Sequence, residues 1–192
     1  MNKSLTLPLL LMAVFYLAAP VFAKECKGVS FPEQTQVDGS RLTLNGLGLR
    51  EATIFKVDVY VAALYLESKS GNPDDILKSA KSKRLILHFV RDVGRSDITK
   101  AWQEGFEANA GNALPSLQDR INTLNGWMTK VKTGERLSFT YLPGTGVQVD
   151  VAGTTKGALK GEDFARALFA IWLGANPPNP ELKSGLLGGN CG

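Results

Sequence analysis

Apolar and polar positions alternate along residues 52–66, which predicts a long β-strand from Ala52 to Leu66. Successive side chains of a strand point to opposite faces, so the segment divides into two sets. One set is wholly apolar or aromatic, and we expect it to face a core: Phe55, Val57, Val59, Val61, Ala63 and Tyr65. The other set starts polar and ends apolar, as on a strand that lines a cleft: Ile54, Lys56, Asp58, Tyr60, Ala62, Leu64 and Leu66.

Further strands are predicted where short alternating runs lie between turn signals. They cover residues 41–45, 83–91, 136–142, 147–151 and 154–159. Pro143-Gly144-Thr145-Gly146 predicts a hairpin with one shared apolar face, made of Leu137, Phe139 and Tyr141 opposite Val147, Val149 and Val151. Lys24 to Gln36 shows no regular pattern, and we expect an irregular segment there.

Helices are predicted from apolar residues three and four apart and from capping residues. The first covers residues 74–79, with Asn72 as N-cap and Pro73 at its first position. We expect Ser96 to cap the second helix and Ser116 the third. Their buried faces are Ile98, Trp102 and Phe106, then Leu117, Ile121, Leu124, Met128 and Val131. Glu162–Leu173 predicts a fourth helix, and Asn179-Pro180 opens a short fifth helix that Gly185 stops.

Strands, helices, strands and helices follow one another without strict alternation. This order predicts an α+β fold, with an antiparallel sheet and helices packed on one face. We see no internal repeat and no second domain.

The stretch Asn45 to Glu67 resembles the chalcone isomerase-like family. Proteins of that family show a G-x-G-x-R turn, here Gly46 to Arg50, and then a strand ending in a VYVAALYLE-like run, here Val59 to Glu67. A weaker similarity covers Ala167 to Gly188. The resemblance implies a long, curved antiparallel sheet with a layer of helices over one face.

The first 23 residues predict a secretory signal peptide. Lys3 gives a short basic start, Leu5 to Val21 is an apolar run interrupted by prolines, and Val21-Phe22-Ala23 precedes Lys24 as a cleavage site. A transmembrane anchor would need about 20 apolar residues and a firmer basic flank. We therefore expect a single domain over residues 24–192, located in the periplasm, with no stable membrane anchor.

We find no nucleic-acid-binding module, and the basic charge is too small and scattered to indicate a nucleic-acid partner. The formal net charge is +4, and removal of Lys3 with the signal peptide lowers it to +3. The basic residues are scattered, and the densest patch, Lys78 to Arg84, is interpreted as a solvated segment before a strand.

The only two cysteines, Cys26 and Cys191, lie at opposite ends of the secreted chain. Export to an oxidising compartment favours a disulfide between them. A metal pair or a redox site are the other interpretations, but there is no CxxC spacing and no nearby histidine. We expect no metal and no cofactor.

Arg50 and Tyr60 are the candidate ligand-binding residues. A guanidinium offers a planar fork of donors that matches a carboxylate or an enolate, and a phenol can donate to the same oxygen. The resemblance implies that Arg50 faces the ligand cleft, and that Arg50 and Tyr60 together hold a carboxylate as in the fatty-acid-binding relatives. Otherwise Arg50 is a surface residue or an ion-pair partner of Asp58, and Tyr60 is a half-buried sheet residue.

The residues that the plant enzymes of this family use for catalysis are absent. The resemblance puts Ile98, Gly105 and Ile171 where those enzymes have a tyrosine, an asparagine and a threonine or serine, and it puts Tyr60 where they have a threonine. No tyrosine occurs between Tyr65 and Tyr141, so the tyrosine is missing in any register. We therefore assign no catalytic residue.

Other candidate groups have structural explanations. His88, the only histidine, lies in an apolar strand, and Ser96 and Ser116 have no base beside them. We expect a secreted protein that binds a small apolar acid, such as a fatty acid, without catalysis. The alternatives are an intramolecular lyase that acts on an enone through Arg50, and an interaction module of the envelope without a ligand.

Overall fold

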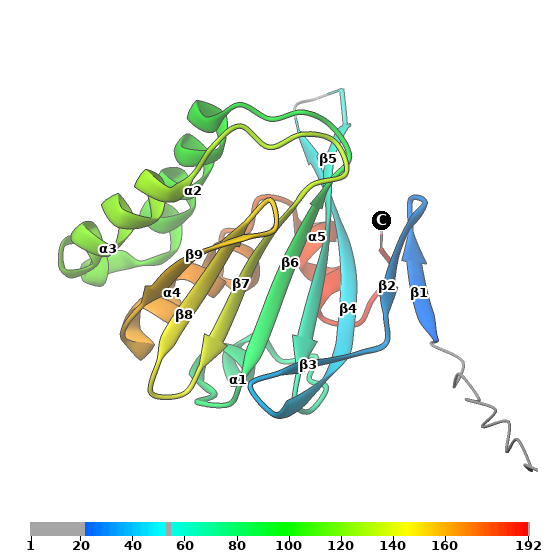
Figure 1. The fold of residues 1–192 in the computed structure, drawn as a ribbon, viewed down its shortest axis with the longest axis horizontal. Coiled ribbons are helices and arrows are strands. Elements are labelled where there is room, and N and C mark those ends of the chain that lie inside the picture. Colours follow the sequence, from blue (N-terminus) through cyan, green and yellow to red (C-terminus); the bar gives the residue numbers. More distant parts are fainter. Residues whose placement is uncertain (1–21, 53–54, 192) are drawn as a thin grey trace, which may run out of the picture.

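A seven-stranded sheet in the order β3-β4-β5-β6-β7-β8-β9 forms the centre of the computed structural model, which describes residues 22–52 and 55–191 (Figure 1). All neighbouring strands are antiparallel. The strands are β3 (Gln34–Val37), β4 (Ser40–Ala52), β5 (Val57–Leu66), β6 (Lys83–Phe89), β7 (Arg136–Leu142), β8 (Gly146–Val151) and β9 (Thr154–Leu159). The curved sheet and its helices confirm the α+β class.

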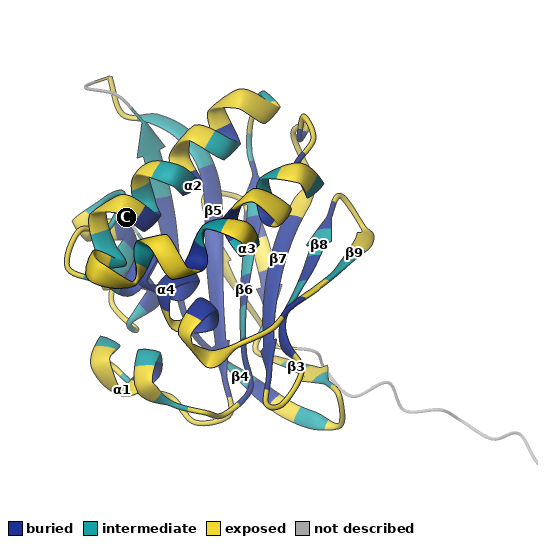
Figure 2. Ribbon diagram, turned by 90° about the vertical axis from the view of Figure 1, so that its left-hand side faces the viewer, coloured by how far each residue is buried: buried dark blue, intermediate teal, exposed yellow. Residues whose placement is uncertain are grey.

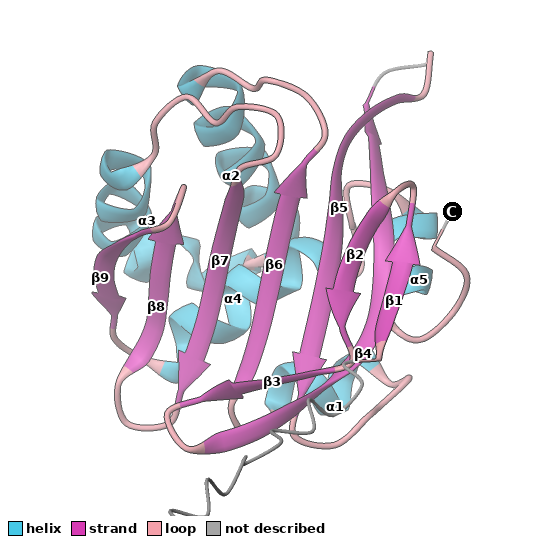
Figure 3. Cartoon of the chain, turned by 45° about the vertical axis from the view of Figure 1, so that its right-hand side comes forward, coloured by secondary structure: helices cyan, strands magenta, loops and turns pink. Residues whose placement is uncertain are grey.

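The described residues include five helices and one 3-10 turn beside the sheet. They are α1 (Pro73–Lys78), α2 (Arg95–Asn109), the turn at Gly111–Ala113, α3 (Leu114–Trp127), α4 (Glu162–Leu173) and α5 (Pro180–Leu186). The helices cover one face of the sheet and turn their buried sides toward it (Figure 2). A hairpin of β1 (Ala23–Cys26) and β2 (Val29–Pro32) lies over the other face, in front of β4 and β5 (Figure 3).

Both faces of β5 are therefore buried, each in a core of its own. Ala62, Leu64 and Leu66 belong to the large core beneath the helices, while Val61 and Tyr65 belong to a smaller core under β1 and β2. The prediction that the wholly apolar face meets a core is confirmed for Val61, Ala63 and Tyr65, which lie in the minor core. It is wrong for Phe55, which is 81% exposed, and for Val59, which is half-buried and packs against the large core instead. The segment over Lys24 to Gln36 is not irregular, because pairing organises it into three short strands.

The predicted glycine-rich turn is wrong, because β4 runs through it as one strand from Ser40 to Ala52. A Cβ atom at Gly46 would collide with the carbonyl oxygen of Gly185, and one at Gly48 would collide with that of Leu182. The two glycines therefore allow α5 to lie directly on the strand backbone. The predicted strand over 52–66 is also interrupted: β5 begins at Val57, and Phe55 and Lys56 lie in a turn.

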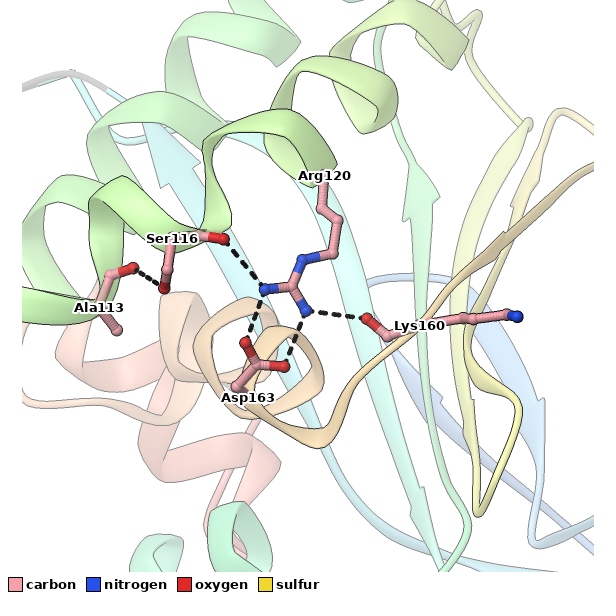
Figure 4. Close-up of polar contacts among 5 residues, drawn as sticks. All are labelled: Ala113, Ser116, Arg120, Lys160 and Asp163. Atoms are coloured by element: carbon pink, nitrogen blue, oxygen red, sulfur yellow. Dashed lines mark hydrogen bonds and ion pairs between the residues drawn. The ribbon is translucent and has the colours of Figure 1, made fainter.

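Two predicted helix caps are wrong. The second helix begins at Arg95 after Gly94, and the third begins at Leu114, with Pro115 in its first turn. Ser116 lies inside the helix and its hydroxyl donates to the carbonyl of Ala113 at 2.8 Å (Figure 4). Proline in the first helical turn was the stronger start signal.

All residues predicted on the buried faces of these helices are buried. Met128 and Val131 lie beyond the end of α3 at Trp127, however, so they belong to the core but not to that helix. Asn72 caps α1 as predicted, and α4 has the predicted bounds. Arg120 of α3 and Asp163 of α4 form a two-pronged ion pair at 2.8 and 2.6 Å, which links the two helices (Figure 4).

The interpretation of Lys78 to Arg84 as a solvated segment is wrong for Lys83. Its side chain is buried, and Nζ donates to the carbonyls of Ile76 at 2.6 Å and Ser79 at 2.8 Å. The ammonium also lies over the ring of Tyr141, 5.2 Å from its centroid. Burial lowers the pKa of Lys83 to about 8.

A disulfide joins Cys26 at the end of β1 to Cys191 after α5, with their Cα atoms 6.0 Å apart. The backbone N–H of Leu49 in β4 donates to the carbonyl of Cys191 at 3.0 Å. Most of the predicted signal peptide, residues 1–21, lies outside the described residues. No helix among those described is long and apolar enough to cross a membrane.

Candidate ligand site

A cavity of about 520 Å³ lies between helix α2, the last turn of α4 and the loop that joins α4 to α5. On the sheet it is bounded by the end of β4, the start of β5 and the end of β6. Such a volume is in the range of small-molecule sites. Its apolar wall includes Val59, Phe89, Ile98, Trp102 and Ile171. Apart from Val59, these side chains are buried, so this wall of the cavity is apolar and suits a hydrocarbon.

Arg50 lines this cavity near the end of β4, beside a bulge between Arg50 and Glu51. Its Nη1 donates to Asn179 Oδ1 at 2.8 Å, to the carbonyl of Pro178 at 3.2 Å and to the carbonyl of Glu51. Asn179 is the N-cap residue of α5, yet its side chain makes no capping bond. The side-chain oxygen holds Arg50 instead.

The expected alternative partner of Arg50, Asp58, pairs with Lys27 at 3.9 Å. Within the described residues, no carboxylate forms an ion pair with Arg50. Its acceptors there are neutral, and all of them use Nη1. In the described structure, the charge of Arg50 is therefore not balanced by a carboxylate in contact with it.

Tyr60 lies directly opposite Arg50 in the register of β4 and β5. Cross-strand partners project from the same face of a sheet, so both side chains reach the cavity. Tyr60 is buried, and its oxygen accepts a hydrogen bond from Trp172 Nε1 at 2.9 Å. Burial raises the pKa of Tyr60 to about 12, although the bond from Trp172 and the charge of Arg50 act against the rise. The phenol therefore stays protonated at ordinary pH.

The positions where plant enzymes would have catalytic groups also line the cavity. Ile98, Gly105 and Ile171 are all part of its wall. A Cβ atom at Gly105 would lie 2.6 Å from Ile171 Cγ2, so α2 and α4 are in close contact there. The wall is thus apolar at these three positions.

Four charged residues at the mouth were not expected from the sequence: Arg91, Asp92, Asp97 and Glu104. All four are exposed. Asp92 accepts hydrogen bonds from Lys130 at 2.9 Å and from the backbone of Thr133 at 3.0 Å, and these lower its pKa to about 2. Arg91 lies two residues beyond the end of β6, but only the pairing of β6 with β5 reveals that it lies near Tyr60.

The remaining candidates lie elsewhere. His88 is on the opposite face of the sheet, where its Nδ1 accepts a hydrogen bond from Arg136 Nε at 3.1 Å. Burial, with the charge of Arg136, lowers its pKa. No group of three or more metal-binding side chains is found in the described part of the chain.

Comparison with known proteins agrees with this architecture. A fatty-acid binding protein of Arabidopsis thaliana has a similar structure, with a TM-score of 0.69 and 18% sequence identity over 88% of this chain and 96% of that chain. At this identity the similarity shows the fold. No curated protein matches the chain. The model of the chalcone isomerase-like family matches residues 23–188. The chain therefore belongs to the chalcone isomerase-like family.

Proposed function

We propose that this protein binds a small apolar carboxylic acid, such as a fatty acid, in the cavity between the sheet and the helices, without catalysing a reaction. Arg50 and Tyr60 would hold the carboxylate, and the apolar wall would hold the tail. The observation that carries the proposal is the pair itself: an arginine that no carboxylate of the described residues pairs with, opposite a protonated tyrosine, beside the apolar wall of a cavity.

The position of Arg50 favours a carboxylate over a neutral head group. Its bonds to Asn179 and Pro178 use one nitrogen and hold the guanidinium plane, so little side-chain entropy is lost when a ligand binds. The rest of the fork remains for the two oxygens of a carboxylate.

The apolar wall supplies most of the binding energy. Burying about ten methylenes at ~0.8 kcal/mol each gives a gross gain of about 8 kcal/mol, from which the costs of ordering are subtracted. The related fold of a fatty-acid binding protein supports this kind of ligand.

The two alternatives are less well supported. A lyase reaction through Arg50 would lack its polar partners, and a tyrosine with a pKa of about 12 is a poor source of phenolate. An interaction module would fill the cleft with its own side chains, whereas this cleft has room for a ligand.

Native mass spectrometry of the purified protein, with lipid extraction, tests the proposal. We expect the wild type to carry a fatty acid or to take up added palmitic acid. Arg50→Ala should weaken binding about 10- to 100-fold, since a hydrogen bond to a charged group contributes about 1.5–3 kcal/mol. Arg41→Ala is the control, because Arg41 is an exposed residue of the same strand outside the cavity.

A wild-type protein that neither carries nor takes up a fatty acid would refute the proposal. Equal loss of binding in Arg41→Ala would show that Arg50 has no special role. We also propose that the mature protein resides in the periplasm. An N-terminus at Lys24 in protein recovered from that compartment is the expected result, and retention of residues 1–23 would contradict it.

A further inference from the structure

We infer that Trp172 is a positioning residue: its indole N–H occupies the oxygen of Tyr60 and so makes the tyrosine a hydrogen-bond donor to an oxygen of the ligand. This inference rests on the proposed function, because it concerns the head group held in the same cavity.

The direction of the bond follows from the chemistry of the two side chains. An indole N–H can only donate, so at 2.9 Å the oxygen of Tyr60 must accept. Tyr60 then has its own O–H left to donate. Among the described residues we find no acceptor for that O–H, and the side chain that carries it lines the cavity.

Trp172 is held firmly by its surroundings. It is fully buried in α4, and its ring packs against Trp102 and Phe139 with centroid distances of 5.4 and 5.6 Å. Tyr60 in turn packs on Phe89 at 5.5 Å. Because both rings are buried and packed, the oxygen of Tyr60 and the indole N–H keep their positions, and their hydrogen bond leaves the O–H directed away from Trp172 before a ligand arrives.

The arrangement selects a class of head group. Arg50 only donates, and Tyr60 is restricted to donating by Trp172. A carboxylate offers acceptors to both. A primary alcohol is a weaker acceptor, and its own O–H finds no acceptor on Arg50 or Tyr60. An ammonium group carries no acceptor atom for either residue, and Arg50 repels its charge. We therefore expect acids to bind better than alcohols of the same chain length, and amines to bind worst.

Binding of palmitic acid and of hexadecanol, measured by displacement of a fluorescent fatty acid, tests the relay. The variants are Tyr60→Phe, Trp172→Phe, the double variant, and Trp127→Phe as a control. Trp127 is half-buried on α3 and lies outside the cavity. Each of the first two changes should lower the affinity for the acid about 10-fold and that for the alcohol much less.

The double variant distinguishes positioning from packing. If Trp172 acts through Tyr60, adding Trp172→Phe to Tyr60→Phe should lower acid binding by less than about twofold further. A second 10-fold loss, or an equal loss for acid and alcohol, would overturn the inference. Binding of both ligands with no preference in the wild type would overturn the inference alone, whereas binding of neither would overturn the proposed function with it.

A spectroscopic measurement keeps the test valid if Trp172→Phe fails to fold. When Tyr60 donates to a carboxylate, its oxygen becomes a better acceptor and the bond from Trp172 strengthens. The indole proton resonance of Trp172 should therefore move downfield when palmitic acid binds to the wild type, and should not move in this way in Tyr60→Phe. An unchanged resonance in the acid-bound wild type would refute the relay.

Discussion

Reduction of the disulfide between Cys26 and Cys191 should greatly destabilise the protein without unfolding it. The bond closes a loop across a sequence separation of 165 residues. The chain-entropy model gives about 5 kcal/mol for such a loop, because the cross-link removes many conformations of the unfolded chain. The folded state should survive, since Cys26 stays in the small core and Leu49 still donates to the carbonyl of Cys191.

Urea unfolding followed by tryptophan fluorescence measures this effect on oxidised protein, on protein reduced with dithiothreitol, and on the double variant Cys26→Ala/Cys191→Ala. The reduced protein and the double variant should agree within about 1 kcal/mol, because both lack the same constraint. Thiol titration confirms the redox state of each sample. A difference below about 1 kcal/mol between oxidised and reduced protein would refute the reasoning.

Three further changes test other parts of the structure. Gly48→Ala should lower the free energy of unfolding in urea by about 3 kcal/mol, because the new Cβ meets the backbone of α5. Gly126→Ala is the control: its new Cβ has open space, so the change should be neutral or stabilise by up to about 1 kcal/mol. Equal effects of the two changes would contradict the close contact at Gly48. Asp163→Asn should lower the free energy of unfolding by only about 1 kcal/mol at pH 7, because solvent screens the ion pair with Arg120. The pKa of Asp163 is lowered to about 2, so the contribution of the pair should vanish as the pH falls from 3.8 to 2. A difference between wild type and variant that stays constant over this range would be inconsistent with the pair. The pKa of Lys83 is lowered to about 8, so between pH 8 and 9.5 the unfolded state binds more protons than the folded state. The free energy of unfolding should therefore rise with pH in this range. Lys83→Met should remove the rise, and a rise that persists in this variant would exclude Lys83 as its cause.

Local signals predicted the parts of the fold that depend on neighbours in the sequence. The register of β7 and β8 followed from a tight turn and from matching apolar faces, with Phe139 opposite Val149 as expected. The bounds of α4 followed from its apolar face and from the two prolines after it, Pro177 and Pro178. Strands β1, β2 and β3 were missed, because segments of four residues gain their stability from pairing and from the disulfide rather than from their own pattern.

The site was only half predictable for the same reason. Arg50 and Tyr60 were chosen from residue chemistry and a family resemblance, but their proximity depends on the turn before Val57. A continuous strand from Ala52 would have carried Tyr60 about 26 Å along its axis. The hairpin instead places Tyr60 directly across from Arg50. The role of Asn179 could not be predicted, because a residue before a proline is normally assigned as a helix cap.

The C-terminal segment supports both stability and the proposed carboxylate site, and two perturbations separate these effects. Arg50 is held by Asn179 at the start of α5, and α5 lies on β4 through two buried leucines, Leu182 and Leu186. The disulfide is attached beyond the end of this helix. Reduction should therefore leave the affinity for palmitic acid within about twofold of the oxidised value, because the helix remains packed.

Gly48→Ala should behave differently, because its new Cβ displaces α5 itself and with it the residues that hold Arg50. We expect acid binding in the folded variant to weaken about 10-fold, the loss of roughly one charged hydrogen bond. The affinity for palmitic acid is measured on both samples without urea, under conditions where each protein is folded. A folded, reduced protein that loses its acid affinity would show that packing alone does not hold the C-terminal segment in place. A Gly48→Ala variant that keeps its acid affinity would show that α5 does not position Arg50.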